Sequence, residues 1–336
     1  MKKLGVGVIG LGVGMKHVLS FESHPNCEIV AVCDFSEDKF VLAKEYNPLL
    51  KTTKDTNQIL EDPGIDIVAI ASYDNYHSSQ IIQAINNEKH VMAEKPLCMN
   101  FDEMLQIHAA HKQNKKIKLS ANHVLRTNSR FTRLKTDITN GKLGDIFYLE
   151  GDYYWGRKEK LFGWRAEMDF YSIIMGGAIH MIDLIMWFLD SRPISVQAMG
   201  NDISSRGTRL QSNSFAVILL KFENGTIAKL TGNGGCVHPH FHGIKIFGTD
   251  RTTIHNMTGA YYLDTSETDS IPIPITEPYP EKESREKVIH SFVDSILDPS
   301  ITPLVPKQDV LDVMSVCFAA EEAMNTEKSI SIKYLN

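Results

Sequence analysis

Cysteine is scarce in this sequence, and its placement excludes two kinds of structure. The five cysteines are odd in number and form no CxxC pair: Cys27, Cys33, Cys98, Cys236 and Cys317. A small secreted domain held by disulfides would have a denser, even set, and a zinc knuckle would have closely spaced pairs. We therefore expect a reducing compartment, without disulfides.

The sequence also lacks a long hydrophobic run and an excess of positive charge. No stretch approaches the roughly 18 apolar residues of a membrane-spanning helix. Gly5 and Gly7 interrupt the first apolar stretch and no cleavage site follows, so no secretory signal is predicted. The 35 basic and 41 acidic residues give a formal charge of −6, which does not suggest nucleic-acid binding. We expect a cytoplasmic protein that binds neither membrane nor nucleic acid.

A chain of 336 residues suits two domains. In the first part, short apolar strands alternate with helical patterns, which favours a parallel sheet covered by helices on both faces. We predict an α/β protein with an N-terminal Rossmann domain, a doubly wound parallel sheet, over residues 1–121. The predicted strands are 4–9, 28–33, 65–71, 90–93 and 117–121, with helices over 78–87 and 100–113.

From residue 122 the pattern changes to strands in series. We predict an α+β domain over 122–336 with a large open, mostly antiparallel sheet for substrate binding and oligomerisation; its C-terminal segment can pack back on the first domain. Because a large apolar sheet face is rarely left exposed, we expect a homodimer or homotetramer. The expected strands are 145–154, 214–222, 226–231, 243–247 and 329–334, with helices over 129–140, 285–297 and 307–325.

The first strand leads into the glycine-rich stretch Gly10-Leu11-Gly12-Val13-Gly14-Met15. Glycines let the backbone approach a pyrophosphate, whose charge then lies at a helix N-terminus. Asp34 ends the next strand at about the spacing where an acid binds an adenosine ribose, and its carboxylate would repel a 2′-phosphate. We therefore predict NAD, in preference to NADP, as cofactor. Met15 departs from the GxGxxG pattern, and an ordinary βα turn is the alternative.

Two more polar segments follow strands at the edge where doubly wound sheets bind ligands. In the first, Ser72, Asp74 and His77 are predicted to line the cofactor site, with an ordinary polar loop as the alternative. In the second, Glu94-Lys95-Pro96, a lysine ammonium could stabilise negative charge on a substrate oxygen and share in taking its proton. Lys95 is the first catalytic candidate, and a surface lysine is the alternative. Pro96 is the residue type at which cis peptide bonds occur.

His180 is the second catalytic candidate, in a helix expected after Gly176-Gly177. Histidine exchanges a proton near neutral pH, as a general base for a secondary alcohol must. Asp183, at i+3, shares its helix face. The alternative is a buried core histidine.

A basic and aromatic set could bind the substrate. Aromatic faces suit sugar rings and guanidinium groups suit anions, so Arg126, Trp164 and Arg165 are predicted to contact substrate with Asp183. Solvated surface charges are the alternative.

Three histidines alternate through His238-Pro239-His240-Phe241-His242, and a strand would direct all three to one face. We predict no metal, because three ligands at this spacing on one straight strand rarely converge on one ion. A substrate-pocket wall that includes His240, or a solvent-exposed edge strand, is expected instead, and Pro239 favours an edge.

Taken in order, Gly10-Leu11-Gly12, Asp34, Glu94-Lys95-Pro96 and the stretch from Gly176 to Asp183 resemble the Gfo/Idh/MocA oxidoreductases over nearly the whole chain. The resemblance implies NAD(P)-dependent dehydrogenation of a sugar or cyclitol, with Lys95 and His180 as catalytic residues. Many members carry an aspartate four residues before this histidine, where this chain has Gly176. His180 then works with Lys95 alone, Asp183 or Asp169 supplies the carboxylate, or the reaction differs.

We predict an NAD-dependent oxidoreductase that transfers a hydride between a sugar, nucleotide-sugar or cyclitol hydroxyl and nicotinamide. Lys95 would polarise the oxygen and His180 would move the proton, which requires the two to converge over one face of the dinucleotide. Two alternatives stay open: an NAD-dependent glycosidase acting through transient oxidation, and a non-catalytic NAD-binding regulator. The lack of an aspartate at Gly176 keeps the regulator hypothesis open, and the presence of Lys95 and His180 argues against it.

Overall fold

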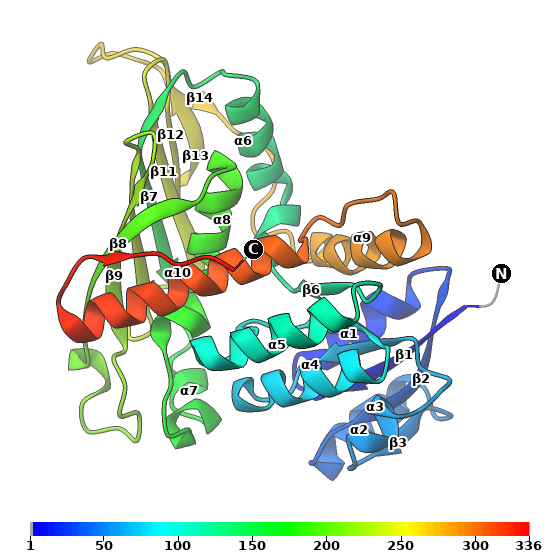
Figure 1. The fold of residues 1–336 in the computed structure, drawn as a ribbon. Helices are drawn as coiled ribbons and strands as arrows, with labels where there is room; N and C mark the ends of the chain where they lie inside the picture. The colour runs from blue at the N-terminus through cyan, green and yellow to red at the C-terminus, as the bar shows by residue number, and fades with distance from the viewer. Residues whose placement is uncertain (1–2, 336) are drawn as a thin grey trace. The chain divides into compact units, whose positions relative to one another are not determined.

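The computed structural model describes residues 3–335, and the chain divides into two compact units (Figure 1). Unit 1 contains the chain up to Val124 and Lys282–Leu311, and unit 2 contains Leu125–Glu281 and the chain from Asp312 onward. Helix α10 (Lys307–Thr326) begins in unit 1 and continues in unit 2, and the short helix η2 (Val124–Thr127) spans the first of the three boundaries along the chain.

Unit 1 contains a six-stranded sheet in the order β3-β2-β1-β4-β5-β6, in which every pairing is parallel. This is the strand order of a Rossmann fold, so the prediction is confirmed. All four residues of β4 are buried, as expected of a strand that is covered on both faces. The strands are β1 (Leu4–Ile9), β2 (Cys27–Cys33), β3 (Lys51–Thr53), β4 (Ile67–Ile70), β5 (His90–Ala93) and β6 (Leu119–Ala121).

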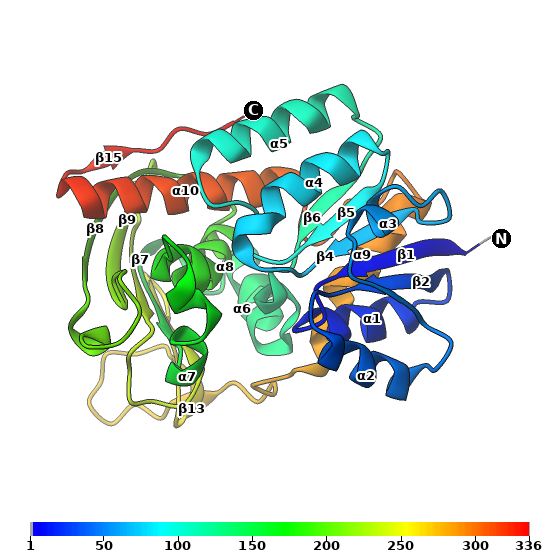
Figure 2. The same cartoon turned by 90° about the horizontal axis from the view of Figure 1, so that it is seen from below.

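Helices cover both faces of this sheet: α4 and α5 lie on one face, and α1, α2 and α9 on the other (Figure 2). Asn100 caps α5, because its side chain accepts the N–H of Glu103 at 2.9 Å. The helices are α1 (Gly14–Glu22), α2 (Glu37–Tyr46), α3 (Asn57–Leu60), η1 (Asp74–Tyr76), α4 (His77–Asn86), α5 (Phe101–Gln113), η6 (Glu283–Arg285) and α9 (Glu286–Leu297).

Unit 2 contains a nine-stranded sheet in the order β14-β13-β12-β11-β7-β10-β9-β8-β15. Its pairings are antiparallel except for that of β7 with β10, which confirms the predicted mostly antiparallel sheet. The strands are β7 (Ile146–Tyr154), β8 (Pro193–Asn201), β9 (Phe215–Phe222), β10 (Ile227–Asn233), β11 (Phe241–Gly248), β12 (Thr252–Asn256), β13 (Gly259–Leu263), β14 (Ile273–Pro274) and β15 (Ile330–Ser331).

Helix α8 (Ile179–Leu189) packs against β7 and β10 of this sheet. A Cβ on Gly151 of β7 would lie 3.2 Å from both Met181 and Ile185 of α8, so a glycine allows this close approach. Along β7, Leu149, Gly151 and Tyr153 are buried, whereas the alternate residues are partly exposed. The other helices of unit 2 are α6 (Ser129–Thr139), α7 (Lys158–Leu161), η3 (Trp164–Glu167), the π-helix η4 (Ile174–Ala178) and η5 (Ile203–Ser205).

One local prediction for unit 2 was wrong, and two segments contain more helix than the sequence predicts. Residues 156–165 contain α7 and the start of η3. The pair Gly176-Gly177 precedes α8, as predicted, and lies inside the π-helix that leads into it. Strand β11 begins at Phe241 and so includes only His242 of the three histidines, and it pairs with β7 and β12, so it is not an edge strand. Pro239 precedes the strand and therefore removes no hydrogen bond from it.

Candidate active site

The glycine turn after β1 has the features that a dinucleotide needs. Gly10 has a φ of +86°, and a Cβ there would lie 2.3 Å from the carbonyl oxygen of Ala71, so glycine is required. A Cβ on Gly12 would meet nothing within 4 Å, which leaves open space beside the backbone. Helix α1 starts at Gly14 without a side-chain cap, so its first N–H groups can bind a phosphate. The turn therefore fits a pyrophosphate.

Asp34 lies at the end of β2 and is bonded to this turn. Its Oδ2 accepts the N–H of Leu11 at 2.7 Å and its Oδ1 accepts the N–H of Ser36 at 2.9 Å. The carboxylate thus lies at the carboxyl end of the parallel strands, where an adenosine ribose binds in this fold. The donor set and the space at Gly12 fit NAD.

Glu94, at the carboxyl end of β5, is held in place by two side chains. The His17 Nε2 lies 2.9 Å from Glu94 Oε1, and the Asn122 side-chain amide donates to the same oxygen at 2.7 Å. Burial would raise the pKa of Glu94, but these hydrogen bonds and the nearby positive charges, including Lys95, lower it to about 2. Glu94 is therefore ionised at neutral pH and unsuited to general acid catalysis.

The next residues form the second loop of this edge. Lys95 is partly exposed, and the bond between Lys95 and Pro96 is cis. His77 is fully buried, with Nδ1 2.7 Å from the Pro96 carbonyl oxygen and Nε2 3.2 Å from that of Ser72. The ring thus links this loop to the one after β4. In that loop the Ser72 hydroxyl donates to Gln80 at 2.7 Å, and Asp74 is buried. Their contacts with a cofactor stay predictions.

In unit 2, His180 belongs to a cluster of aromatic rings. Its imidazole stacks on Tyr153 of β7 with ring centroids 5.6 Å apart, and it lies edge-on to His242 at 5.9 Å. His240 lies 5.5 Å from Tyr153 and 4.9 Å from His242. Burial raises the pKa of Tyr153 to about 12, so its phenol is neutral.

Trp155 extends this cluster to the predicted aromatic and basic residues. It lies edge-on to Tyr153 at 5.9 Å, and the Arg165 guanidinium lies 5.3 Å from its ring. The same guanidinium lies 4.3 Å from the Trp164 ring. Ring and cation–π contacts thus join His180, His240, Trp164 and Arg165 in one cluster, and their contacts with substrate stay predictions.

Arg126 and Asp183 form a buried ion pair with each other. The side chains are 3% and 1% exposed. Arg126 Nε donates to both Asp183 oxygens at 3.1 and 3.2 Å, and Nη2 donates to Oδ1 at 2.7 Å. In the structure the two side chains therefore bind each other. Their contacts with substrate stay predictions.

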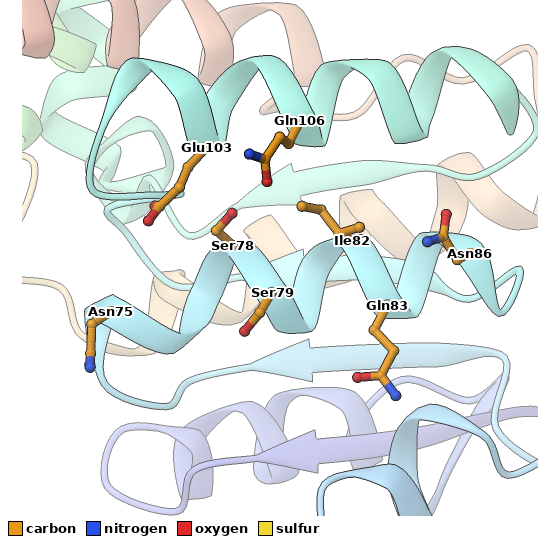
Figure 3. Close-up of a pocket in the computed structure, with 8 residues that line it drawn as sticks. All are labelled: Asn75, Ser78, Ser79, Ile82, Gln83, Asn86, Glu103 and Gln106. Carbon is orange, nitrogen blue, oxygen red and sulfur yellow. The ribbon is translucent and has the colours of Figure 1, made fainter.

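In unit 1 a groove of about 460 Å³ lies between α4 and α5 (Figure 3). One lining residue, Glu103, is ionisable, and its carboxylate accepts the N–H of Met99 at 2.8 Å. The groove is lined by Asn75, Ser78, Ser79, Ile82, Gln83, Asn86, Glu103 and Gln106, none of them a predicted site residue. Within the described part of the chain, no three His, Cys, Asp or Glu side chains are grouped as metal ligands. In residues 3–335 no helix is both long and apolar enough to cross a bilayer.

Several residues around Glu94 and around His180 were not predicted from the sequence. His17 follows the glycine turn, but its partner Glu94 is 77 residues away, so no local pattern joins them. Asn122 directly follows β6 at the same sheet edge, which was an available signal. Tyr153 and Trp155 lie at the end of β7, and only the packing of α8 on that strand brings Tyr153 to His180.

The parallel sheet, its strand order and the glycine turn define unit 1 as a dinucleotide-binding unit. Comparison with protein families agrees: residues 4–123 match the oxidoreductase family with an NAD-binding Rossmann fold, and residues 131–254 match the GFO/IDH/MocA C-terminal domain. The chain therefore belongs to the GFO/IDH/MocA oxidoreductase family, as the resemblance in the sequence indicated.

Individual relatives have low sequence identity to this chain. The uncharacterized oxidoreductase YrbE of Bacillus subtilis is 24% identical over 340 residues, which covers 99% of this chain and 98% of the relative. Myo-inositol 2-dehydrogenase of Thermotoga maritima is 26% identical, with 73% and 72% covered. The crystal structure of scyllo-inositol dehydrogenase from Lactobacillus casei with bound NAD(H) and scyllo-inositol has a TM-score of 0.80, 21% identity, and 98% and 99% coverage. At this identity the structural likeness shows the fold.

Proposed function

We propose that the protein is an NAD-dependent dehydrogenase that acts on a secondary hydroxyl of a sugar, nucleotide-sugar or cyclitol. The observation that carries this proposal is the setting of His180, a proton-transfer group within a cluster of aromatic, imidazole and guanidinium side chains. Aromatic faces bind the C–H surfaces of sugar rings, and the polar groups bind their hydroxyls. Relatives named as inositol dehydrogenases support the substrate class.

Each residue has one task in the proposed reaction. The His180 imidazole takes the hydroxyl proton, and the Lys95 ammonium stabilises the negative charge that develops on the same oxygen. The carbinol C–H bond breaks and a carbonyl forms. Bound NAD would supply the acceptor for the hydride that leaves that carbon. Glu94 stays ionised and, with Gly10, Gly12 and Asp34, belongs to the cofactor side of the reaction.

The experiment is a survey of inositols, sugars and nucleotide-sugars with NAD, followed by reduced-cofactor absorbance. We expect net reduction with at least one member of the panel. Tight NAD binding without turnover of any polyol would contradict the proposal. Release of a sugar without net reduced cofactor would instead favour the glycosidase.

Asp34 is expected to set the preference for NAD over NADP. Asp34→Asn removes the charge that repels a 2′-phosphate and keeps one side-chain oxygen that can accept the Leu11 N–H. We expect the ratio of kcat/KM for NADP to that for NAD to rise by about tenfold or more, since a charged hydrogen bond contributes about 1.5–3 kcal/mol. Asp38→Asn, at an exposed position in α2, is the matched control and should leave the ratio unchanged. An unchanged ratio in Asp34→Asn would contradict the assignment.

We further propose that the open face of the unit 2 sheet pairs with a second copy of the chain. Met199, Leu219 and Ile227 are 73%, 44% and 46% exposed on this face, beside the ionic residues Lys229 and Glu150. Exposed apolar side chains of this kind are typical of a homo-oligomer interface.

Light scattering coupled to gel filtration should therefore give at least twice the 37.8 kDa mass of the chain. Leu219→Glu should yield monomer, because the new carboxylate can pair with the neighbouring Lys229 within one copy but would be desolvated in an interface. Leu49→Glu, at a site that is 93% exposed in unit 1, should have no effect. A monomeric natural protein would contradict the proposal.

A further inference from the structure

A buried tyrosine hydroxyl occupies the space beside Gly176. A Cβ built on Gly176 would lie 1.9 Å from the Tyr171 hydroxyl oxygen and 2.6 Å from the ring carbon that carries it. Tyr171 is 2% exposed, so its ring is fixed by the surrounding core. No side chain fits at position 176 unless this ring moves. The phenol hydroxyl therefore takes the place that a side chain at 176 would fill.

This place is next to His180 on the helix. The π-helix η4 continues directly into α8, and Gly176 precedes His180 by four residues. Residues four apart on a helix are neighbours, with about 5–6 Å between their Cβ atoms. Because the Tyr171 oxygen lies 1.9 Å from the Cβ position of Gly176, it is placed on the side of the helix from which a hydrogen bond, through one water where needed, would reach the His180 imidazole.

Ring contacts connect the two residues by a second route. Tyr171 lies edge-on to Trp155 at 6.4 Å, Trp155 to Tyr153 at 5.9 Å, and Tyr153 stacks on His180 at 5.6 Å. Tyr171 thus belongs to the same aromatic cluster as His180.

The backbone that carries Tyr171 is firmly held. Its N–H donates to the Ser212 hydroxyl at 3.2 Å. The next residue, Ser172, accepts the N–H of Met175 at 2.9 Å and donates its own hydroxyl hydrogen to the buried carboxyl of Glu321. Burial raises the pKa of Glu321 to about 7. The start of η4 is therefore fixed on both sides, as a residue that orients another must be.

We propose that Tyr171 is a positioning residue that orients the His180 imidazole through its hydroxyl, from the place that Gly176 leaves open. A phenol hydroxyl both donates and accepts a hydrogen bond, so it can select one imidazole tautomer without adding a charge to this buried turn. The role in catalysis rests on the proposed function, whereas the effect on the imidazole itself does not.

Two single-atom deletions separate positioning from stability. Tyr171→Phe removes the hydroxyl and keeps the ring, and we expect kcat for the polyol to fall about 10- to 100-fold with little change in the KM for NAD or in Tm. The matched control is Tyr262→Phe, since Tyr262 is also buried and donates to Asp137 at 2.6 Å. It should lower Tm and leave kcat unchanged. Natural kcat in Tyr171→Phe would overturn the proposal.

A measurement without substrate tests the same contact. Ring 15N shifts of histidine-labelled protein report the tautomer of His180, whose signals are identified by their loss in His180→Gln. We expect them to move in Tyr171→Phe and to stay in place in Tyr262→Phe. If the natural protein oxidises no polyol but these signals move, the proposed function fails and the positioning role stands. If they stay in place in folded Tyr171→Phe, the positioning role fails whatever the activity.

Discussion

Lys95→Met is expected to lower kcat by about 10²- to 10⁴-fold, the range for loss of one group that acts on the developing charge or proton of a reaction. Methionine keeps most of the length and apolar stem of lysine but cannot carry a charge. The neighbouring carboxylate should stay in place, because His17 and Asn122 hold Glu94 independently of Lys95. NAD affinity, measured by calorimetry, should therefore change by only a few-fold.

The matched control lies at the other end of the same strand. Lys89 directly precedes β5, is 8% exposed, and donates from Nζ to the Asp62 carbonyl oxygen at 2.7 Å. Lys89→Met should cost about 1–3 kcal/mol of stability, because it leaves that carbonyl without its donor, and should keep kcat. The two lysines should differ because ligands bind at the carboxyl ends of parallel strands, and Lys95 follows that end of β5 whereas Lys89 precedes the strand. Full turnover in Lys95→Met would remove Lys95 from the reaction, whereas full biological activity of a Lys95→Met variant without turnover would revive the regulator hypothesis.

The sequence was most informative where a strand is buried on both faces. Such strands read as continuous apolar runs, so β4 and β5 were predicted to within a few residues. β3 was missed because it has three residues, of which one is buried, and so carries no pattern. The edge-strand interpretation of the three histidines was wrong, because alternation predicts a common face only within a strand, and β11 begins after His238 and His240 and pairs on both sides.

Candidate site residues were likewise predicted where the signal is local, and missed where it depends on tertiary packing. Spacing identified the glycine turn, Asp34 and the Glu94-Lys95-Pro96 motif, because each follows a strand along the chain. The partners that fix them come from tertiary packing, as His17 does for Glu94 and Tyr153 does for His180. Gly176 illustrates the limit: the sequence shows a missing side chain, and only the structure shows a hydroxyl in its place.

Asp183→Ala is expected to be the most destabilising of these substitutions. It leaves the Arg126 guanidinium buried without its carboxylate, which typically costs about 3–5 kcal/mol. For a unit of this size that loss lowers Tm by about 6–20 °C, measurable by calorimetry. Asp202→Ala breaks an exposed pair with Arg206, whose side chains are 52% and 66% exposed, and should change stability by less than about 1 kcal/mol.

The double variant Arg126→Met/Asp183→Leu tests why Asp183→Ala should lose stability. If the cost comes from an uncompensated buried charge, replacing both partners by apolar side chains should restore most of the lost Tm. If Asp183 instead binds substrate, as its position three residues after His180 first suggested, Asp183→Ala should raise KM or lower kcat with little effect on Tm. The bidentate contact and near-complete burial of both groups favour the first outcome, in which Asp183 serves the reaction by fixing the helix that carries His180.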